Sequence, residues 1–280
     1  PESAGWNAAI GWTLSNATAQ PGDAFALNMP DVFGFDSDSD SDSTTTTKRM
    51  MKRATTNPTI YLSSDGISYA SCELISAGLT GNSSSIQCTI LDSINTLPAG
   101  TPIDGELIVP IVFNVGGSGS ASDLAAANAI QPGPQVITFD DGDFDISLDV
   151  DFAAGASSPE DPDDIVYAIR AMPWDNEDSI YVLGGSCGTN LSVSGDLGIQ
   201  VTDGSLDCSS YEALMTNNLN AWYFPKSDEV IPSVSLVSCS SSEILISYEN
   251  LPLGYRAFMD LLAVPDSTDF SASYTNSFTC

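Results

Sequence analysis

Histidine is absent from this 280-residue sequence, and basic residues are scarce, with 7 lysines and arginines against 37 aspartates and glutamates. Without histidine, the chain cannot form a Ser–His–Asp triad, a histidine general acid or a histidine-ligated zinc site. A formal net charge of −30 at pH 7 repels phosphate backbones and anionic membranes, so we expect no nucleic-acid partner. No apolar run approaches the roughly 20 residues of a membrane-spanning helix, so no direct membrane insertion is expected. No signal peptide is visible, so a secreted protein would be represented here by a mature fragment.

Paired carboxylates are the remaining route to catalysis. Asp140 and Asp141 are adjacent, and residues 160–164 read EDPDD. Such pairs are relevant because two carboxylates can hydrolyse a glycosidic bond. With 37 acids among 280 residues, however, such clusters arise by chance, and the second cluster lies in a segment with no core residues. We therefore predict that the protein is not an enzyme and holds no cofactor.

The six cysteines are dispersed and form no Cys-x-x-Cys pair, which favours disulfides over a zinc site. Two lie in the first half of the chain and four in the second, and fifteen connectivities are possible before any other information is used. Three N-glycosylation sequons accompany them and favour a secretory, extracellular route, at Asn16, Asn82 and Asn190.

Short apolar alternations separated by Gly, Pro, Asn and Asp turns run through almost the whole sequence, as in residues 59–62, 107–113, 144–150, 180–183, 234–237 and 244–248. Many short strands at regular spacing predict an all-β protein built of antiparallel sandwiches. Only residues 123–130 and 211–219 suggest short connecting helices. At 280 residues, two domains are the default, and residues 153–164, AAGASSPEDPDD, are the best boundary. We predict a first domain of residues 1–155, a linker of residues 156–164 and a second domain of residues 165–280.

A low-complexity stretch interrupts the first domain at residues 36–53, DSDSDSDSTTTTKRMMKR. Its four aspartates and four basic residues neutralise each other, and it has no β-patterned core, so we predict a mobile insertion that folding does not require. Alternate carboxylates suit calcium, but the glycine and terminal glutamate of an EF-hand loop are missing, so we predict no metal site. Two dibasic pairs, at residues 48–49 and 52–53, leave proteolytic processing open as an alternative to an exposed loop.

Residues 6–35, WNAAIGWTLSNATAQPGDAFALNMPDVFGF, carry the most information. Ile10, Trp12 and Leu14 alternate with small or polar residues, the PGD sequence at residues 21–23 predicts a turn, and the alternation then resumes, which predicts a pair of strands. This segment closely resembles the opening of the Als (agglutinin-like sequence) adhesins of yeast cell walls, relatives of the sexual alpha-agglutinin. The resemblance continues in order through SSDGISYASC, FNVGGSG, ITFDDGDFDISLDVDF, LNAWYFP, LPLGYRAFMD and SYTNSFTC.

The resemblance implies two tandem immunoglobulin-like sandwiches that hold an extended peptide, entering by its C-terminus, in a cleft between them. It also implies three disulfides, Cys72–Cys88, Cys187–Cys280 and Cys208–Cys239. A further family cysteine pair is missing here, since its positions are occupied by Asp31 and Ala129.

At the implied cleft, this sequence departs from its relatives. In the family's segment matching DVFGF, which includes Phe33, a lysine can receive the peptide's terminal carboxylate, but here that position is Gly34. A buried carboxylate without a partner is severely penalised. Val112 replaces a small residue of the cleft wall and should narrow it. Arg170 matches a family arginine, and two roles are open for it: an anchor for the ligand's carboxylate, or a structural salt bridge.

The resemblance implies the ligand-binding head of a secreted, glycosylated cell-wall adhesin, whose stalk and lipid (GPI) anchor would lie outside these residues. Its partners would be proteins or peptides on other cells or host surfaces. One alternative is a structural or self-associating wall glycoprotein that has lost the peptide pocket. Another is a carbohydrate-binding lectin, although sandwich tryptophans are usually core residues; the tryptophans are Trp6, Trp12, Trp174 and Trp222.

Overall fold

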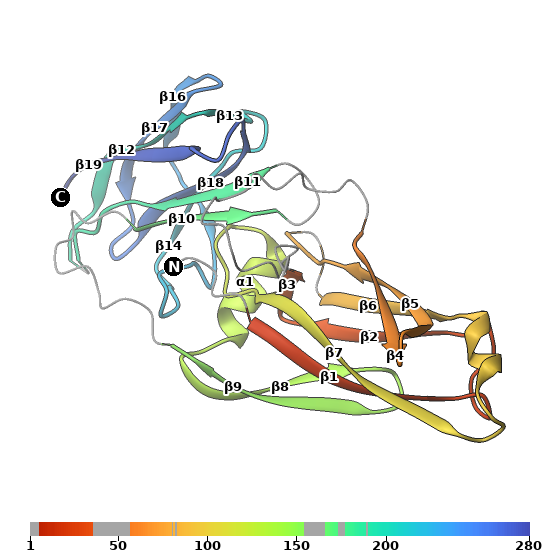
Figure 1. Ribbon diagram of the computed structural model, residues 1–280. Helices are drawn as coiled ribbons and strands as arrows, with labels where there is room; N and C mark the ends of the chain where they lie inside the picture. The colour runs from red at the N-terminus through yellow and green to blue at the C-terminus, as the bar shows by residue number, and fades with distance from the viewer. Residues whose placement is uncertain are drawn as a thin grey trace.

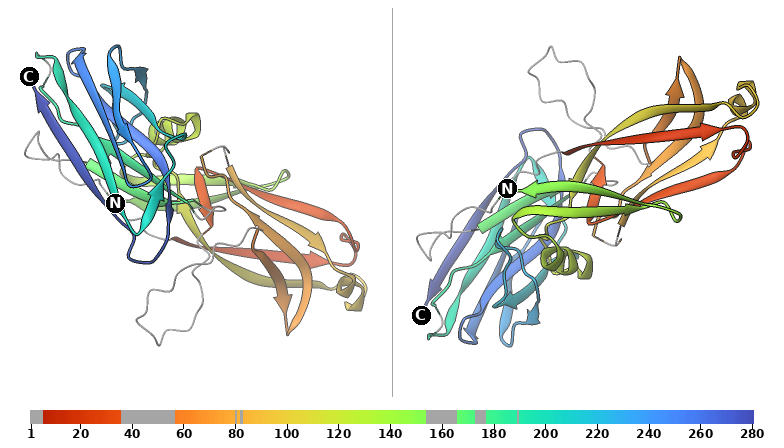
Figure 2. Two further views of the ribbon diagram at one scale, coloured as in Figure 1. Left: turned by 90° about the horizontal axis from the view of Figure 1, so that it is seen from above. Right: turned by 90° about the horizontal axis from the view of Figure 1, so that it is seen from below.

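The computed structural model describes residues 6–35, 57–79, 81, 83–153, 166–172, 177–188 and 190–280. The described chain forms two lobes, one from residues before 154 and one from residues after 165 (Figure 1). The lobes lie side by side along the molecule in both views of Figure 2, and a short helix lies where they meet. The predicted insertion at residues 36–53 and the predicted linker at residues 156–164 fall outside the described residues.

Two antiparallel sheets make up the first lobe. One has the strand order β1-β7-β3, and the other has the order β4-β5-β6-β2-β8-β9. The strands are β1 (Trp6–Ser15), β2 (Ala24–Pro30), β3 (Val32–Phe35), β4 (Thr59–Ser64), β5 (Ile67–Ile75), β6 (Ser83–Ile90), β7 (Pro102–Phe113), β8 (Gly133–Asp140) and β9 (Asp145–Phe152). A 3-10 helix, η1 (Asp92–Thr96), and an α-helix, α1 (Ala121–Ala129), flank β7 in the sequence.

The second lobe also has two antiparallel sheets. One has the order β10-β11-β18-β14-β15, with β13 paired to β18, and the other has the order β16-β17-β12-β19. The strands are β10 (Val166–Ala171), β11 (Asp178–Leu183), β12 (Val193–Thr202), β13 (Gly204–Leu206), β14 (Glu212–Thr216), β15 (Glu229–Val230), β16 (Val234–Cys239), β17 (Glu243–Leu251), β18 (Arg256–Pro265) and β19 (Ser271–Thr279). The prediction of an all-β fold of antiparallel immunoglobulin-like sandwiches is confirmed.

One local prediction needs correction. Residues 211–219 were expected to suggest a helix, but β14 lies there, because Leu214 pairs with Phe258 of β18 and Met215 is buried. Tertiary packing here overrides a weak local preference. The two strands predicted around the PGD turn are present as β1 and β2, and they pair with other strands: β1 with β7, and β2 with β6 and β8. The turn therefore joins opposite sheets of the sandwich. The helix expected at residues 123–130 is present as α1.

The buried apolar side chains form two clusters that divide the molecule unequally. One cluster lies wholly within the second lobe, between its two sheets, with Ile180, Leu197 and Ile246 among its fully buried members. The other fills the first lobe and continues across the junction into five residues of the second lobe, which are Tyr181, Leu183, Trp222, Phe224 and Phe258. The first sandwich therefore completes its core against the face of the second.

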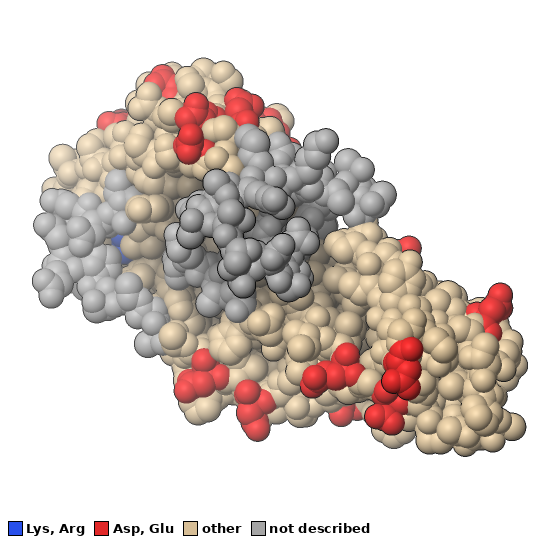
Figure 3. Space-filling model, viewed as in Figure 1, with Lys and Arg blue, Asp and Glu red and all other residues tan. Residues whose placement is uncertain are grey.

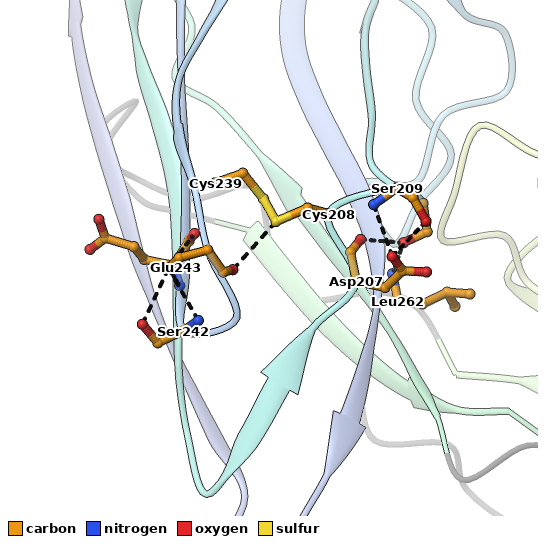
Figure 4. The surroundings of a disulfide bond; sticks show 9 residues. Asp207, Cys208, Ser209, Cys239, Ser242, Glu243 and Leu262 are labelled. Carbon is orange, nitrogen blue, oxygen red and sulfur yellow. Dashed lines mark hydrogen bonds between the residues drawn. A yellow bond between two sulfur atoms is a disulfide. The ribbon is translucent and has the colours of Figure 1, made fainter.

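Three disulfides are present, and their pairing is the one that the family resemblance implies: Cys72–Cys88, Cys187–Cys280 and Cys208–Cys239. The first joins directly opposed residues of β5 and β6, which are sixteen positions apart in the sequence. The other two are in the second lobe and span 93 and 31 residues. Figure 4 shows the third of these, where the Cys208 sulfur lies 3.4 Å from the carbonyl oxygen of Ser240. The second lobe thus has the more extensive covalent bracing.

Candidate functional site

The candidate site begins where the chain crosses from one sheet of the first lobe to the other. Asp31 connects β2 to β3 with φ of 60°, a left-handed conformation that is uncommon outside glycine, asparagine and aspartate. Its carbonyl oxygen accepts a hydrogen bond of 2.7 Å from the backbone N–H of Asn114. Burial raises the pKa of the Asp31 carboxyl. This crossing places β3 beside the end of β7.

Phe33, Gly34 and Val112 meet in that strand pair. Gly34 lies directly opposite Val112, and the register shifts between Val32 and Gly34, so Phe33 occupies an irregular position. Phe33 is only 2% exposed, Gly34 is buried and Val112 is half-buried. The result is a short apolar strip with no ionisable side chain of its own.

Arg170 of β10 reaches this strip from the second lobe. The centre of its guanidinium lies 4.1 Å from the centroid of the Phe33 ring, within the range of a cation–π contact. Its Nη2 donates to Asp123 Oδ2 of α1 at 2.5 Å, and its Nη1 lies 3.3 Å from Asp123 Oδ1 and 3.2 Å from the carbonyl oxygen of Gly116. The Arg170 side chain is 15% exposed and that of Asp123 is fully buried. A cation of the second lobe is therefore paired with a buried anion of the first.

Asp123 organises the loop between β7 and α1 as well as binding Arg170. It accepts hydrogen bonds from the Asn114 amide at 3.0 Å and from the Ser118 hydroxyl at 2.6 Å. Ser120 caps the helix by accepting from the Asp123 N–H. Buried charges are stable only when they are paired and hydrogen-bonded in this way. Of the two roles open for Arg170, the described structure contains the salt bridge.

The structure therefore brings the four residues singled out for ligand binding, Phe33, Gly34, Val112 and Arg170, into one contiguous region. Sequence reasoning did not identify Asp123 as the partner of Arg170. The serine–x–x–aspartate spacing at Ser120 and Asp123 predicts a helix start, but one carboxylate among 37 acids cannot be matched to an arginine 47 residues away without the fold.

The remaining residues singled out in the sequence are the tryptophans and the asparagines of the glycosylation sequons. Trp6 packs against Phe113 and Phe152 with ring centroids 5.8 and 5.7 Å apart, and Trp222 is 9% exposed, so these rings serve the core. The Asn16 amide donates to the carbonyl oxygen of Leu97 at 2.7 Å, whereas Asn190 is exposed. Asn82 and Trp174 lie outside the described residues.

Two kinds of site are absent from the described part of the chain: a cluster of metal ligands and a membrane-spanning helix. No group of three or more His, Cys, Asp or Glu side chains there is arranged to hold a metal ion. None of the helices described is long and apolar enough to cross a membrane. Acidic side chains are spread over both lobes in the view of Figure 3, with very little basic surface among them.

Comparison with known proteins identifies relatives along the whole chain. A family model described as "Agglutinin-like protein, N-terminal domain" matches residues 11–280. Agglutinin-like protein 1 of Candida albicans is 35% identical over 278 residues, which cover 98% of this chain and 20% of that protein. Agglutinin-like protein 2 of the same species is 36% identical over 282 residues, covering 100% and 10%, and agglutinin-like protein 3 is 34% identical over 283 residues, covering 100% and 23%.

The chain thus spans less than a quarter of the length of these relatives. Among solved structures, the collagen adhesin of S. aureus aligns over 97% of this chain and 82% of that chain at 13% identity, with a TM-score of 0.41. A similarity this low supports no conclusion about the ligand.

Proposed function

The chain belongs to the family of agglutinin-like proteins, and from that premise we propose that it is the ligand-binding head of an extracellular adhesin anchored in a cell wall. In this proposal the head binds proteins or peptides on other cells or host surfaces and catalyses no reaction. The names of its curated relatives are those of agglutinin-like proteins rather than of enzymes, which supports the second part.

We propose that the ligand binds at the junction of the lobes beside the apolar strip of Phe33, Gly34 and Val112, where Val112 is partly exposed and the buried Phe33 and Gly34 lie next to it. One observation carries the specificity of this proposal: the cation beside the strip, Arg170, is already bound to the buried carboxylate of Asp123. A ligand carboxylate would have to break that ion pair, and Gly34 offers no replacement charge. The site therefore selects extended peptide segments by apolar and main-chain contacts, without requiring a free C-terminus.

A peptide library presented with free and amidated C-termini tests this specificity. The unmodified protein should bind both forms with similar affinity. Gly34→Lys should strengthen binding of free-ended peptides by about ten- to a hundredfold, since a hydrogen bond to a charged group contributes roughly 1.5 to 3 kcal/mol. The double change Gly34→Lys with Val112→Ala restores space as well as charge.

Gly11→Lys is the matched control, because it adds the same charge to an exposed strand glycine with no neighbouring atoms within 4 Å of the new Cβ. This variant should leave both affinities unchanged. A hundredfold preference of the unmodified protein for free C-termini would contradict the proposal, and Arg170→Ala would then show whether Arg170 leaves Asp123 to bind the ligand.

Self-association is a second candidate function, and the edge strand β16 favours it. Val234, Leu236 and Val237 of this strand are 41%, 46% and 57% exposed. Apolar side chains on an edge strand favour pairing with another chain. Sedimentation velocity of the unmodified protein and of Leu236→Lys tests this: self-association through β16 requires a concentration-dependent dimer that the variant loses.

A further inference from the structure

A cavity of about 390 Å³ lies between the lobes, apart from the apolar strip. The first lobe lines it with Leu79 and the loop that enters α1, and the second lobe lines it with side chains of β11, β14 and β18 and with Ser210. Both apolar and polar surfaces are present, since Leu79, Ala121 and Leu262 face the same space as several hydroxyl groups and two carboxyl groups. No feature of the proposed adhesive site accounts for this arrangement.

The two carboxyl groups belong to directly opposed residues of neighbouring strands. Asp260 of β18 lies between Glu212 of β14 and Tyr181 of β11 in the sheet register. Side chains at such positions share a face of the sheet and lie roughly 5 Å apart at Cβ, and like charges there repel. Glu212 is exposed, whereas Asp260 is 9% exposed, so a cation or a proton at Asp260 would relieve the repulsion.

Two polar atoms that line the cavity have no hydrogen-bond partner among the described residues. Asp260 is 9% exposed and its Oδ2 accepts from the Gly119 N–H at 2.9 Å, but its Oδ1 accepts no hydrogen bond. Ser179 lies on the adjacent strand, is only 3% exposed, and its hydroxyl makes no hydrogen bond in the described structure. Both oxygens are open to the cavity, so they are available to hydrogen-bond to an occupant there.

Charges around Asp260 determine which occupant fits. Burial raises the pKa of Asp260 to about 7, the Gly119 N–H opposes this, the carboxylates of Glu212 and Asp123 add to it, and Arg170 lowers it. Tyr181, the other cross-strand neighbour, is neutral because burial raises its pKa well above its ordinary value. Arg170 is bound to Asp123, so the negative charge of the cavity is not neutralised by a cation within it.

We propose that this cavity binds a primary alkylammonium group, the chemistry of a lysine side chain or of a free aliphatic amine. The ammonium donates its three hydrogen bonds to Asp260 Oδ1, the Glu212 carboxylate and the Ser179 hydroxyl. The methylene chain lies against Leu79, Ala121 and Leu262. The lack of three grouped metal-ligating side chains among the described residues makes an organic cation a better fit than a metal ion.

Calorimetric titration of the full chain at pH 8 with two ammonium probes tests the proposal. The probes are Nα-acetyl-lysine N-methylamide, which represents a protein side chain, and n-butylammonium, which represents a free amine. Their neutral counterparts, the Nε-acetylated lysine derivative and n-butanol, are the controls. We expect ammonium probes to bind at least roughly tenfold more tightly than neutral ones, as a charge-assisted hydrogen bond requires. If the lysine derivative binds best, the source is a protein; if only n-butylammonium binds, the source is a free amine.

Lowering the pH provides a readout that a purely apolar cavity would not give. Because the Asp260 pKa is about 7, ammonium affinity should fall by roughly tenfold or more between pH 8 and pH 5.5, and binding near pH 6.5 should release a proton. Release is detected by repeating the titration in buffers of different ionisation enthalpy. Unchanged affinity over this range overturns the proposal.

Two variants locate the binding. Asp260→Asn and Ser179→Ala should each weaken binding of the ammonium probes, by roughly tenfold or more and by a few-fold, whereas Asp149→Asn, on an exposed position of β9, should not. Ser179→Ala removes only a hydroxyl, so it keeps the test valid if Asp260→Asn fails to fold. Binding that neither variant alters would mean that the probes bind elsewhere, and no difference between charged and neutral probes would mean that the carboxylates play no part; either result overturns the proposal.

Discussion

The two lobes have similar architectures but reach stability differently. The second lobe encloses its own apolar cluster between two sheets and carries two disulfides, which close loops of 93 and 31 residues. The first lobe has one short-range disulfide, and its apolar cluster continues into the aromatic face of the second lobe at Tyr181, Phe224 and Phe258. The first lobe therefore has no core separate from the junction, whereas the second lobe has one core of its own and also buries an aromatic face against the first.

Removing the disulfide that closes the longest loop should have the largest effect on the stability of either lobe. Cys187→Ala with Cys280→Ala should lower the free energy of unfolding of the second lobe by about 4 to 5 kcal/mol, because a 93-residue loop closes at high entropic cost. Cys72→Ala with Cys88→Ala should cost about 3 kcal/mol, since that loop is shorter. Urea denaturation of both variants checks the order. Equal costs, or a larger cost for the shorter loop, would show that loop entropy does not distinguish the lobes.

Breaking the Arg170–Asp123 ion pair at the junction should destabilise the first lobe more than the second. Arg170→Ala leaves the buried Asp123 carboxylate without its cation and should cost about 3 to 5 kcal/mol. Hydrogen exchange should show the loss chiefly in the loop at residues 114–120 and in the first lobe.

The matched control is Lys226→Ala, since only backbone atoms of Lys226 make hydrogen bonds in the described structure. It should change stability by no more than about 0.5 kcal/mol. A double variant of Arg170→Ala with Asp123→Ala should cost less than the sum of the two single changes. Strict additivity of the three values would exclude a direct coupling between these residues.

The stability of the folded protein should depend on pH through Asp260, which lies on the second lobe where it faces the first. Its pKa is about 7 in the folded protein, against an ordinary value of 3.8, so the folded state holds the proton more tightly than the unfolded state. The stability that this carboxyl contributes is complete below pH 3.8 and is lost as the pH rises through about 7. Asp260→Asn should remove this loss and gain roughly 1 to 4 kcal/mol on the unmodified protein between pH 4 and pH 8.

Denaturant unfolding at several pH values measures that difference, with Asp149→Asn as a control on an exposed strand position. The control should follow the unmodified protein at every pH. A profile of Asp260→Asn parallel to that of the unmodified protein would mean that Asp260 ionises normally.

The smallest effect is expected from deleting residues 36–53. This insertion lies outside the described residues, so the prediction rests on its sequence, which has eight charged residues, eight serines and threonines and no β-patterned core. Deletion should shift the melting temperature by no more than a few degrees. If no folded protein is obtained, the insertion is part of the first lobe's structure after all.

Local patterns in the sequence were sufficient to predict many of the strands. The alternation of β9, in which Val150 and Phe152 are buried between exposed aspartates, identifies a half-buried strand directly. The same reasoning failed for β14, because Leu214 and Met215 become a strand only through pairing with β18, a contact between distant parts of the chain. Pairing of β1 with β7 rather than with β2 is likewise a property of the whole sandwich, which a turn sequence does not specify.

The candidate site was predictable only in part, for a related reason. Family resemblance pointed to Gly34, Val112 and Arg170, and the fold places them together. The partner of Arg170 and the cavity at Asp260 depend on which side chains two lobes present to each other. Local spacing carries no information about that contact, so Asp123, Ser179 and Glu212 did not stand out in the sequence.

Gly119 has a consequence for how the family can vary. A Cβ atom at this position would lie 2.5 Å from Cδ1 of Leu214, closer than real Cβ contacts allow, so a side chain at residue 119 would force the end of the Leu214 side chain to move. In evolutionary terms, positions 119 and 214 should tend to change together: a relative with alanine at the first position needs a smaller residue or a different side-chain rotamer at the second. A collection of relatives with independent substitutions at the two positions would show that their lobes meet in a different way.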